Sequence, residues 1–398
     1  MTLLTKKSIW LLTIGAFFAF FVFGLSDNLK GPTLPALLAD LKINYSTGGT
    51  ILLGAYLGFM VATLTTGLLA DKVGQKTVLI LATFCMAGGV AGFSSFTAPL
   101  LLTASMLLLG FGLGGIELGC NALIVELHKS DKGRYLNLMA VLHGLGSMIG
   151  PLYAGALLAG HKSWRAVYAW DLVLIGLLAF YFSMTVFPPK AETISEKLDL
   201  LHLGKTAFSL PMILFYCAIT VYVATEIGIA AWMVEFLQKE RQFSVTQSTQ
   251  ALSLFFGLIM IGRFVGSFLV EKLGYLKSIF ISALAASICI ALALFGSNSL
   301  SYLLPASGFF LSIIFPTITA AVSDGHSENM NTILGLLFTF AGFGGVLGPW
   351  LIGIISDLVG LKLGFALNLL FGLLTALSVF LLLRVTSIDN KHLPAKSA

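Results

Sequence analysis

Long apolar runs dominate this sequence and restrict the chain to one environment, the lipid bilayer. Twelve stretches of about twenty or more predominantly apolar residues follow one another along its length. A helix needs about twenty apolar residues to cross the hydrocarbon core of a membrane. A strand of a membrane barrel needs only about ten, with apolar and polar positions alternating. The sequence therefore predicts an all-α membrane protein with twelve transmembrane helices.

The twelve expected spans share this length and apolar character. They cover approximately residues 8–29, 47–70, 77–95, 99–125, 136–159, 165–187, 207–236, 250–270, 276–296, 299–322, 331–355 and 362–384. The composition agrees, because 57% of the residues are hydrophobic and 10% are charged, whereas soluble domains carry about 25% charged residues. A soluble globular protein and a disordered chain are both excluded.

The cysteines and glycines give no sign of an enzyme centre. Cys85, Cys120, Cys217 and Cys289 all fall inside expected spans and show no metal-ligand spacing. The glycines around Gly112 lie within an apolar run rather than after a strand, so they do not form a phosphate-binding loop. We therefore expect buried thiols, no metal, no cofactor and no catalytic residues.

The basic residues predict which side of the membrane each loop faces. With the N-terminus inside, fifteen lysines and arginines fall on the inner side, and seven, including Lys30 and Lys42, on the outer side. Because positive charge concentrates in cytoplasmic loops, both termini are expected in the cytoplasm. Anionic lipid accounts for the net charge of +5 without a nucleic-acid partner. The compact loops favour the inner membrane of a bacterium.

Two halves are visible in the order of the spans. The polar stretch from about Pro188 to Lys205 separates six spans from six. This division predicts an N-terminal half over 1–189, a cytoplasmic linker over 190–205 and a C-terminal half over 206–398. Such a division predicts that the two halves share sequence motifs.

Two short motifs recur in equivalent places of the two halves. The loops after spans 2 and 8 each carry an acid, a lysine and a glycine, within Gly67–Lys76 and Gly266–Lys277. Spans 5 and 11 each contain a glycine-proline segment, Gly146–Gly155 and Gly344–Gly353. Two parallel six-helix repeats form a binding site between them near the middle of the membrane. The repeat predicts a transporter that works by alternating access, although close helix packing also accounts for the glycines.

The loop after span 2 resembles the signature between helices 2 and 3 of the major facilitator superfamily. The twelve-span plan of that family also agrees with the chain over essentially its whole length. The resemblance implies the major facilitator fold and a conformational gate that latches helices on the cytoplasmic side. The gate residues in this loop would be Gly67, Asp71, Lys72, Gly74 and Lys76. A helix cap followed by a solvated turn is the alternative interpretation.

Ionisable side chains inside the spans are functional candidates, because each costs several kcal/mol unless it is paired or hydrated. The deep ones are Asp27, Glu117, Glu226 and Arg263. Those near span ends, expected at the membrane interface, are Glu126, Asp171, Glu235 and Asp357. We expect Arg263 to pair with a buried acid or with carbonyls, as part of the gate.

Two of the deep acids are expected to couple transport to protons. Glu117 follows a glycine-rich run that leaves room beside its face of the helix, and Asn121 lies one turn later on that face. A carboxyl withdrawn from water holds a proton more readily than one in solution. Asp27 is expected near the outer end of span 1. The alternatives are an interhelical hydrogen bond for Glu117, and a surface cap or a pair with Lys30 for Asp27.

An acid and an aromatic residue share a helix face in span 7. Tyr222 and Glu226 are four residues apart there. This combination suits sugars, whose hydroxyls bind carboxylates and whose C–H faces lie on aromatic rings. The alternative is again an interhelical hydrogen bond.

These residues resemble the fucose permease branch of the superfamily, which comprises sugar–proton symporters. The likeness rests on Asp27 between Ser26 and Asn28, on Glu117 after its glycines, on Arg134–Asn137 and on the Glu226 segment with Trp232. It implies that Asp27 and Glu117 bind the proton and the sugar. Substrate-binding residues would be Asn121, Asn137, Tyr222, Glu226 and Trp232.

The leading hypothesis is a monomeric symporter that takes up a monosaccharide-like solute with protons. A proton-driven efflux antiporter for small amphiphiles or sugars is the alternative, because Gly146–Gly155 resembles a motif of such antiporters. Carboxylates also bind sodium, so the coupling ion stays open at this point. A sensor that has the fold without transporting is a third possibility.

Overall fold

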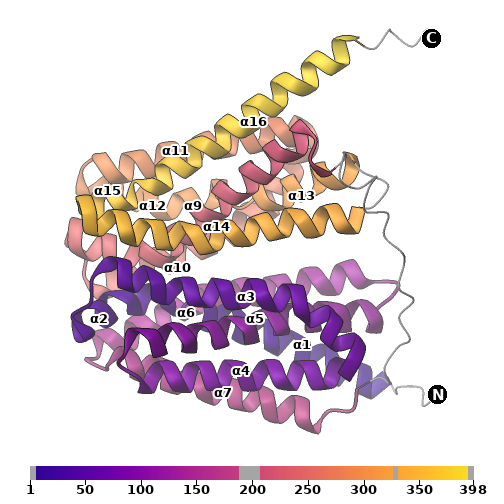
Figure 1. The fold of residues 1–398 in the computed structure, drawn as a ribbon, viewed down its shortest axis with the longest axis vertical. Coiled ribbons are helices and arrows are strands. Elements are labelled where there is room, and N and C mark those ends of the chain that lie inside the picture. Colours follow the sequence, from indigo (N-terminus) through magenta and orange to yellow (C-terminus); the bar gives the residue numbers. More distant parts are fainter. Residues whose placement is uncertain (1–5, 188–206, 326–329, 393–398) are drawn as a thin grey trace. The chain divides into compact units, whose positions relative to one another are not determined.

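The regular structure is helical throughout the residues that the computed structural model describes, 6–187, 207–325 and 330–392 (Figure 1). The helices of the first half are α1 (Lys6–Asp27), α2 (Lys30–Leu41), α3 (Tyr45–Val73), α4 (Gln75–Ser95), α5 (Pro99–Leu127), α6 (Lys132–Ala159) and α7 (Trp164–Met184). Those of the second half are α9 (Leu210–Arg241), α10 (Val245–Leu273), α11 (Tyr275–Phe295), the short 3₁₀ helix η1 (Asn298–Tyr302), α12 (Leu303–Leu311), α13 (Ile314–Gly325), α14 (Met330–Val359), α15 (Leu361–Phe365) and α16 (Leu367–His392).

The expected number of spans is confirmed. Within the described ranges, twelve helical stretches are long and apolar enough to cross a membrane. The first of them combines α1 with α2, and the tenth combines η1, α12 and α13. The expected linker over 190–205 lies outside the described residues, so the division of the chain there stays a prediction.

The first span is longer than its apolar run suggested. It continues to Leu41 instead of ending near residue 29, with a break between α1 and α2. Gly31-Pro32 resembles a helix end in the sequence. However, Pro32 is the third residue of α2, in the first helical turn, where a missing N–H costs no helical hydrogen bond. Asp27 therefore lies at an internal break of the span, and not near its outer end as expected.

The glycine-proline segments bring helices into close contact in the same way in both halves. A Cβ atom added to Gly146 on α6 would meet the backbone carbonyl of Phe21 on α1. A Cβ atom added to Gly344 on α14 would meet the carbonyl of Thr220 on α9. Gly150 and Gly348, one turn later, repeat the contact with the carbonyls of Leu25 and Ala224. The packing interpretation of these glycines thus holds, and the contact recurs as the sequence repeat predicted.

The loops after spans 2 and 8, which carry the repeated motif, also share one backbone conformation. Gly74 joins α3 to α4 with φ of +84°, and Gly274 joins α10 to α11 with φ of +80°. Each donates its N–H to the carbonyl four residues earlier, on Ala70 and Val270, at 2.9 Å. Glycine adopts this positive φ without the steric cost that other residues meet. The conformation explains why both loops carry glycine at this position.

Contacts group the chain into two compact units. Unit 1 comprises Met1–Ser195, Ala230–Gly257 and Pro349–Gly364, and unit 2 comprises Glu196–Ile229, Leu258–Gly348 and Phe365–Ala398. Unit 1 thus holds the first six spans together with one end of each of α9, α10 and α14. Within it α3 packs on α5, α4 on α5 and α7, and α1 on α6.

Candidate functional site

A break in the first span positions the polar groups of the site in unit 1. α1 ends at Asp27 and α2 begins at Lys30. The Asn28 amide holds the break in place by donating to the Gly24 carbonyl at 2.8 Å and to Ser147 Oγ of α6 at 3.0 Å. An interrupted membrane helix exposes backbone and side-chain polar groups in the interior, an arrangement that transporters use to bind ions and solutes.

Asp27 and Lys30 form an ion pair across this break. Lys30 Nζ lies 2.5 Å from Asp27 Oδ1 and 4.2 Å from the centroid of the Tyr56 ring on α3. Lys30 is only 4% exposed, so the expectation that it belongs to an outer loop is corrected. The physical reason is that α2 continues the span beyond Lys30. The pair that was the alternative interpretation of Asp27 is present.

Glu117 interacts with the acidic member of this ion pair. It projects from α5, is partly exposed, and interacts electrostatically with Asp27. Glycines bring α5 against α3 here, because a Cβ atom on Gly114 would lie 2.7 Å from the Ala62 side chain. The structure therefore brings the two expected proton-coupling residues together in one cluster. That cluster contains two carboxyl groups and one ammonium group.

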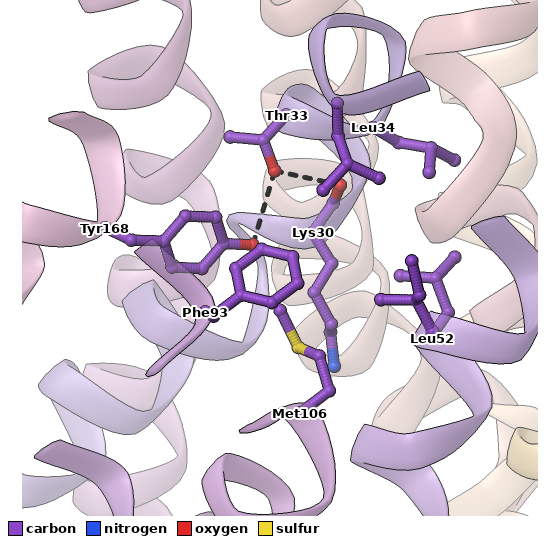
Figure 2. A pocket seen from close by; sticks show the side chains of 9 residues that line it. Lys30, Thr33, Leu34, Leu52, Phe93, Met106 and Tyr168 are labelled. Atoms are coloured by element: carbon purple, nitrogen blue, oxygen red, sulfur yellow. Dashed lines mark hydrogen bonds between the residues drawn. The ribbon is translucent and has the colours of Figure 1, made fainter. Parts of the chain in front are cut away.

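The space around Lys30 is almost filled. The cavity beside it, lined by Thr33, Tyr168 and mostly apolar neighbours, measures about 10 Å³, which barely holds one water molecule. Figure 2 shows the Thr33 hydroxyl bridging the Lys30 carbonyl and the Tyr168 hydroxyl, each at 3.3 Å. A sugar does not fit here, so this part of the cluster is a charge site and not a solute cavity.

A further buried acid escaped the sequence analysis. Asp171 on α7 was expected at the membrane interface, but it is 1% exposed. Its Oδ1 accepts a hydrogen bond from Ser26 at 3.0 Å, and its Oδ2 has no partner among the described residues. No signal in the sequence could have placed it, because its burial depends on α1 packing across it.

The acid and the aromatic residue of span 7 meet as expected, in unit 2. The Tyr222 hydroxyl donates a hydrogen bond to the Glu226 carboxylate. Arg263 on α10 is exposed and interacts electrostatically with Tyr222. The Tyr222 ring lies 6.5 Å from the ring of Phe315, measured between centroids. Acid, hydroxyl and aromatic groups thus gather in one place, as binding of a hydroxylated ring requires.

The other expected solute contacts are more scattered. Asn121 is partly exposed one turn after Glu117, and Asn137 is exposed on α6. Trp232 is fully buried in unit 1, and its indole N–H donates to the Pro349 carbonyl at 2.9 Å. Within the part of the chain that the structure describes, no hydrogen bond or ring contact joins any two of these three residues. Their solute contacts stay a prediction.

The expected cytoplasmic gate is partly described. Lys76 donates to the carbonyls of Ser183 at 3.1 Å and Thr185 at 3.0 Å, at the C-terminal end of α7, where a cation complements the helix dipole. Gly67 has open space where a side chain would begin, and Lys72 is exposed. The side chain of Asp71 lies outside the described set.

At the opposite end of the spans, helices from the two halves meet within unit 1. Asp357 near the end of α14 accepts hydrogen bonds from the backbone N–H groups of Tyr45 at 2.9 Å and Ser46 at 2.7 Å, which begin α3. A Cβ atom added to Gly353 would lie 2.5 Å from the Tyr45 carbonyl. The Tyr45 hydroxyl donates to Glu235, which is 1% exposed. We call these residues of α3, α9 and α14 the end contact.

Comparison with known proteins identifies relatives along most of the chain. The sequence profile described as Major Facilitator Superfamily matches residues 16–336. The glucose/galactose transporter of Brucella abortus is 24% identical over 367 residues, which cover 88% of this chain and 89% of that protein.

Solved structures show the same fold. The nucleoside transporter NupG has a TM-score of 0.80 at 16% identity, covering 95% of this chain and 99% of that chain. The fucose:proton symporter FucP of E. coli has a TM-score of 0.62 at 18% identity, with 94% and 99% covered.

Proposed function

The chain belongs to the Major Facilitator Superfamily, and from this premise we propose that it takes up a monosaccharide-like solute with protons by alternating access. Like its named relatives, it is a multi-pass membrane transporter and not an enzyme. The observation that carries the proton-coupling proposal is the cluster of Asp27, Lys30 and Glu117 at the break of the first span.

The charges of this cluster supply the reason for coupling. Two carboxylates and one ammonium leave one net negative charge, which is costly in a low-dielectric interior. Binding of one proton makes the cluster neutral. A neutral cluster can change its exposure from one side of the membrane to the other without moving an ion through the lipid core. Movement of solute is thereby tied to movement of a proton.

The proposed solute class follows from the second group of residues and from the relatives. Tyr222 and Glu226 combine an aromatic face with hydroxyl and carboxylate groups, which suits a hydroxylated ring. The Brucella relative is named for glucose and galactose, and FucP for fucose and protons. We assign Tyr222 and Glu226 to solute binding, with Asn121, Asn137 and Trp232 as further contacts.

The efflux alternative has less support. It depended on the motif Gly146–Gly155, and the glycines of this motif serve helix packing in the structure. The equivalent segment of α14 does the same on α9. A packing motif that recurs in both halves carries no information about the direction of transport.

The setting of the proposed transporter completes the proposal. We place it as a monomer in the inner membrane of a bacterium. Both termini are expected in the cytoplasm, because basic residues predominate in the loops on that side. The end contact then faces the outside. Protons are favoured over sodium because Lys30 already occupies the place of a cation beside Asp27.

Reconstitution tests the proposed function directly. The purified full chain is placed in liposomes, and the external pH is recorded on addition of D-glucose, D-galactose or L-fucose. External alkalinisation with one sugar, abolished by a protonophore, is the expected result. A sodium gradient replaces the proton gradient in a parallel arm. If none of the three sugars changes the external pH and amphiphilic cations are transported instead, the proposal is contradicted and the efflux alternative is supported.

Replacement of Asp71 tests the cytoplasmic gate. Asp71→Asn removes the acid of the loop motif while keeping its size, so we expect slower transport with an unchanged order of preferred sugars. Initial uptake rates for each sugar measure both quantities. Thr77→Ser, a mild change just beyond the motif, is the control and leaves the rates unchanged. A changed sugar preference in Asp71→Asn shows that the gate assignment is wrong.

A further inference from the structure

We propose that Lys30 is the fixed counter-ion of Asp27, and that this pairing leaves Glu117 as the group that takes up the coupling proton. The inference rests on the proposed function and deepens it. The sequence suggested the Asp27–Lys30 pair only as an alternative to proton coupling by Asp27. The inference also changes the role of Asp27, which the sequence analysis assigned to proton coupling.

The surroundings of Lys30 tie its charge to Asp27. The ammonium is enclosed, with 4% of the residue exposed, and the adjoining cavity of about 10 Å³ has no room for a hydrated anion. A buried cation requires a partner in contact. Asp27 Oδ1 at 2.5 Å is that partner, and the Tyr56 ring adds a cation–π contact.

The other groups that face Asp27 do not compete for this role. The titratable groups facing it are Lys30 of α2, Tyr56 of α3, Glu117 of α5 and Tyr168 of α7. From α6 the neutral Ser147 hydroxyl contacts the break through Asn28. One turn earlier on α6, the titratable His143 ring lies 4.6 Å from the Phe23 ring, on the face of α1 that carries Asp27. Among these groups Lys30 is the one in direct contact with the Asp27 carboxylate, at 2.5 Å.

The position of the proton follows from this arrangement. A proton on Asp27 would leave the enclosed ammonium without its contact anion. A proton on Glu117 removes the repulsion between two carboxylates and keeps the ion pair intact. Either choice makes the cluster neutral, but only the second preserves the contact at 2.5 Å. Glu117 is therefore the carrier, and Asp27 with Lys30 forms a permanent neutral pair.

This assignment makes an unusual prediction for single and double variants. In Asp27→Asn the cluster keeps one ammonium, that of Lys30, and one carboxylate, that of Glu117. The cluster is then neutral without a proton, so solute crosses without being accumulated. In the double variant Asp27→Asn with Lys30→Met, both charges of the pair are gone. Glu117 is free to take up a proton again, and accumulation returns.

The experiment compares accumulation with exchange in proteoliposomes of the full chain. Radiolabelled D-galactose is the probe, and an inward proton gradient drives accumulation, while counterflow exchange reports binding and reorientation without net coupling. We expect Asp27→Asn to exchange galactose with an accumulation ratio of one. The double variant is expected to regain galactose-dependent proton uptake and accumulation. Lys162→Met, which removes an exposed lysine, is the matched control and behaves as the unmodified chain.

The double variant decides the question even if a single variant does not assemble. Proton-coupled accumulation by the double variant supports the proposal, because neither Asp27 nor Lys30 is then needed to carry the proton. Exchange without accumulation, or no activity at all, overturns it. Failure of the proposed function is distinguishable, because the unmodified chain itself then moves no protons with galactose. If the unmodified chain moves no protons with galactose, the inference is contradicted without any comparison of variants.

Discussion

Replacement of Glu117 by glutamine abolishes accumulation of the solute while exchange across the membrane continues. Glutamine keeps the shape and the hydrogen-bonding capacity of a protonated glutamic acid but never releases a proton. The cluster with Asp27 and Lys30 is then permanently neutral. The helices can still reorient with solute bound, but no proton accompanies the solute.

The size of this effect follows from the driving force. One proton moving across a potential of 100 mV supplies about 2.3 kcal/mol, which supports an accumulation of roughly fifty-fold. In Glu117→Gln this ratio falls to one. Accumulation of labelled galactose under an imposed potential measures the ratio, and counterflow gives the exchange rate. Glu126→Gln, a partly exposed acid nine residues later on α5, is the control. Undiminished accumulation in Glu117→Gln would remove this residue from the coupling mechanism.

Replacement of Gly353 by valine opens the end contact. A Cβ atom at this position lies 2.5 Å from the Tyr45 carbonyl and 3.2 Å from the Trp232 ring, and neither the backbone nor the fully buried indole can move away cheaply. Overpacking of this kind costs about 1–3 kcal/mol. That cost lowers the population of the state with this end closed by about five-fold to over a hundred-fold. Transport slows because the cycle must pass through that state.

Accessibility measures this shift independently of transport. Thr249 is 1% exposed in unit 1, where it faces Gly155 of α6. A cysteine at position 249 is expected to react faster with an external, membrane-impermeant maleimide when Gly353→Val is also present. Gly335→Val is the matched control, because a side chain at Gly335 on the same helix meets open space. Equal labelling rates in both backgrounds would show that the end contact does not form in the working protein.

The sequence was sufficient for the fold because the information lies in local patterns. Apolar runs of membrane length define the spans, and the repeated loop with Gly74 and Gly274 shows the relation between the halves. Both features depend on residues near one another in the chain. Tyr222 and Glu226 were found for the same reason, since residues four apart on a helix share a face.

The candidate site was only partly predictable because its contacts join distant segments. Lys30 looked like a loop residue, since Gly31-Pro32 imitates a helix end. Burial of Asp171 depends on Ser26, which is 145 positions away in the chain. Distance from a span end is a poor measure of burial, because a neighbouring helix can cover any turn. The sequence could name Asp27 and Glu117 separately but could not show that the Lys30 ammonium is buried against Asp27.

The boundary between the two compact units has a mechanical consequence. Besides the short α15, it cuts three long helices, α9 after Ile229, α10 after Gly257 and α14 after Gly348. Each cut lies at or beside a glycine, and on α14 the next residue is Pro349, which cannot donate the helical hydrogen bond. Bending stiffness is therefore lowest where the helices pass from one unit to the other. These three points are therefore where we expect each helix to bend most readily when the transporter changes conformation.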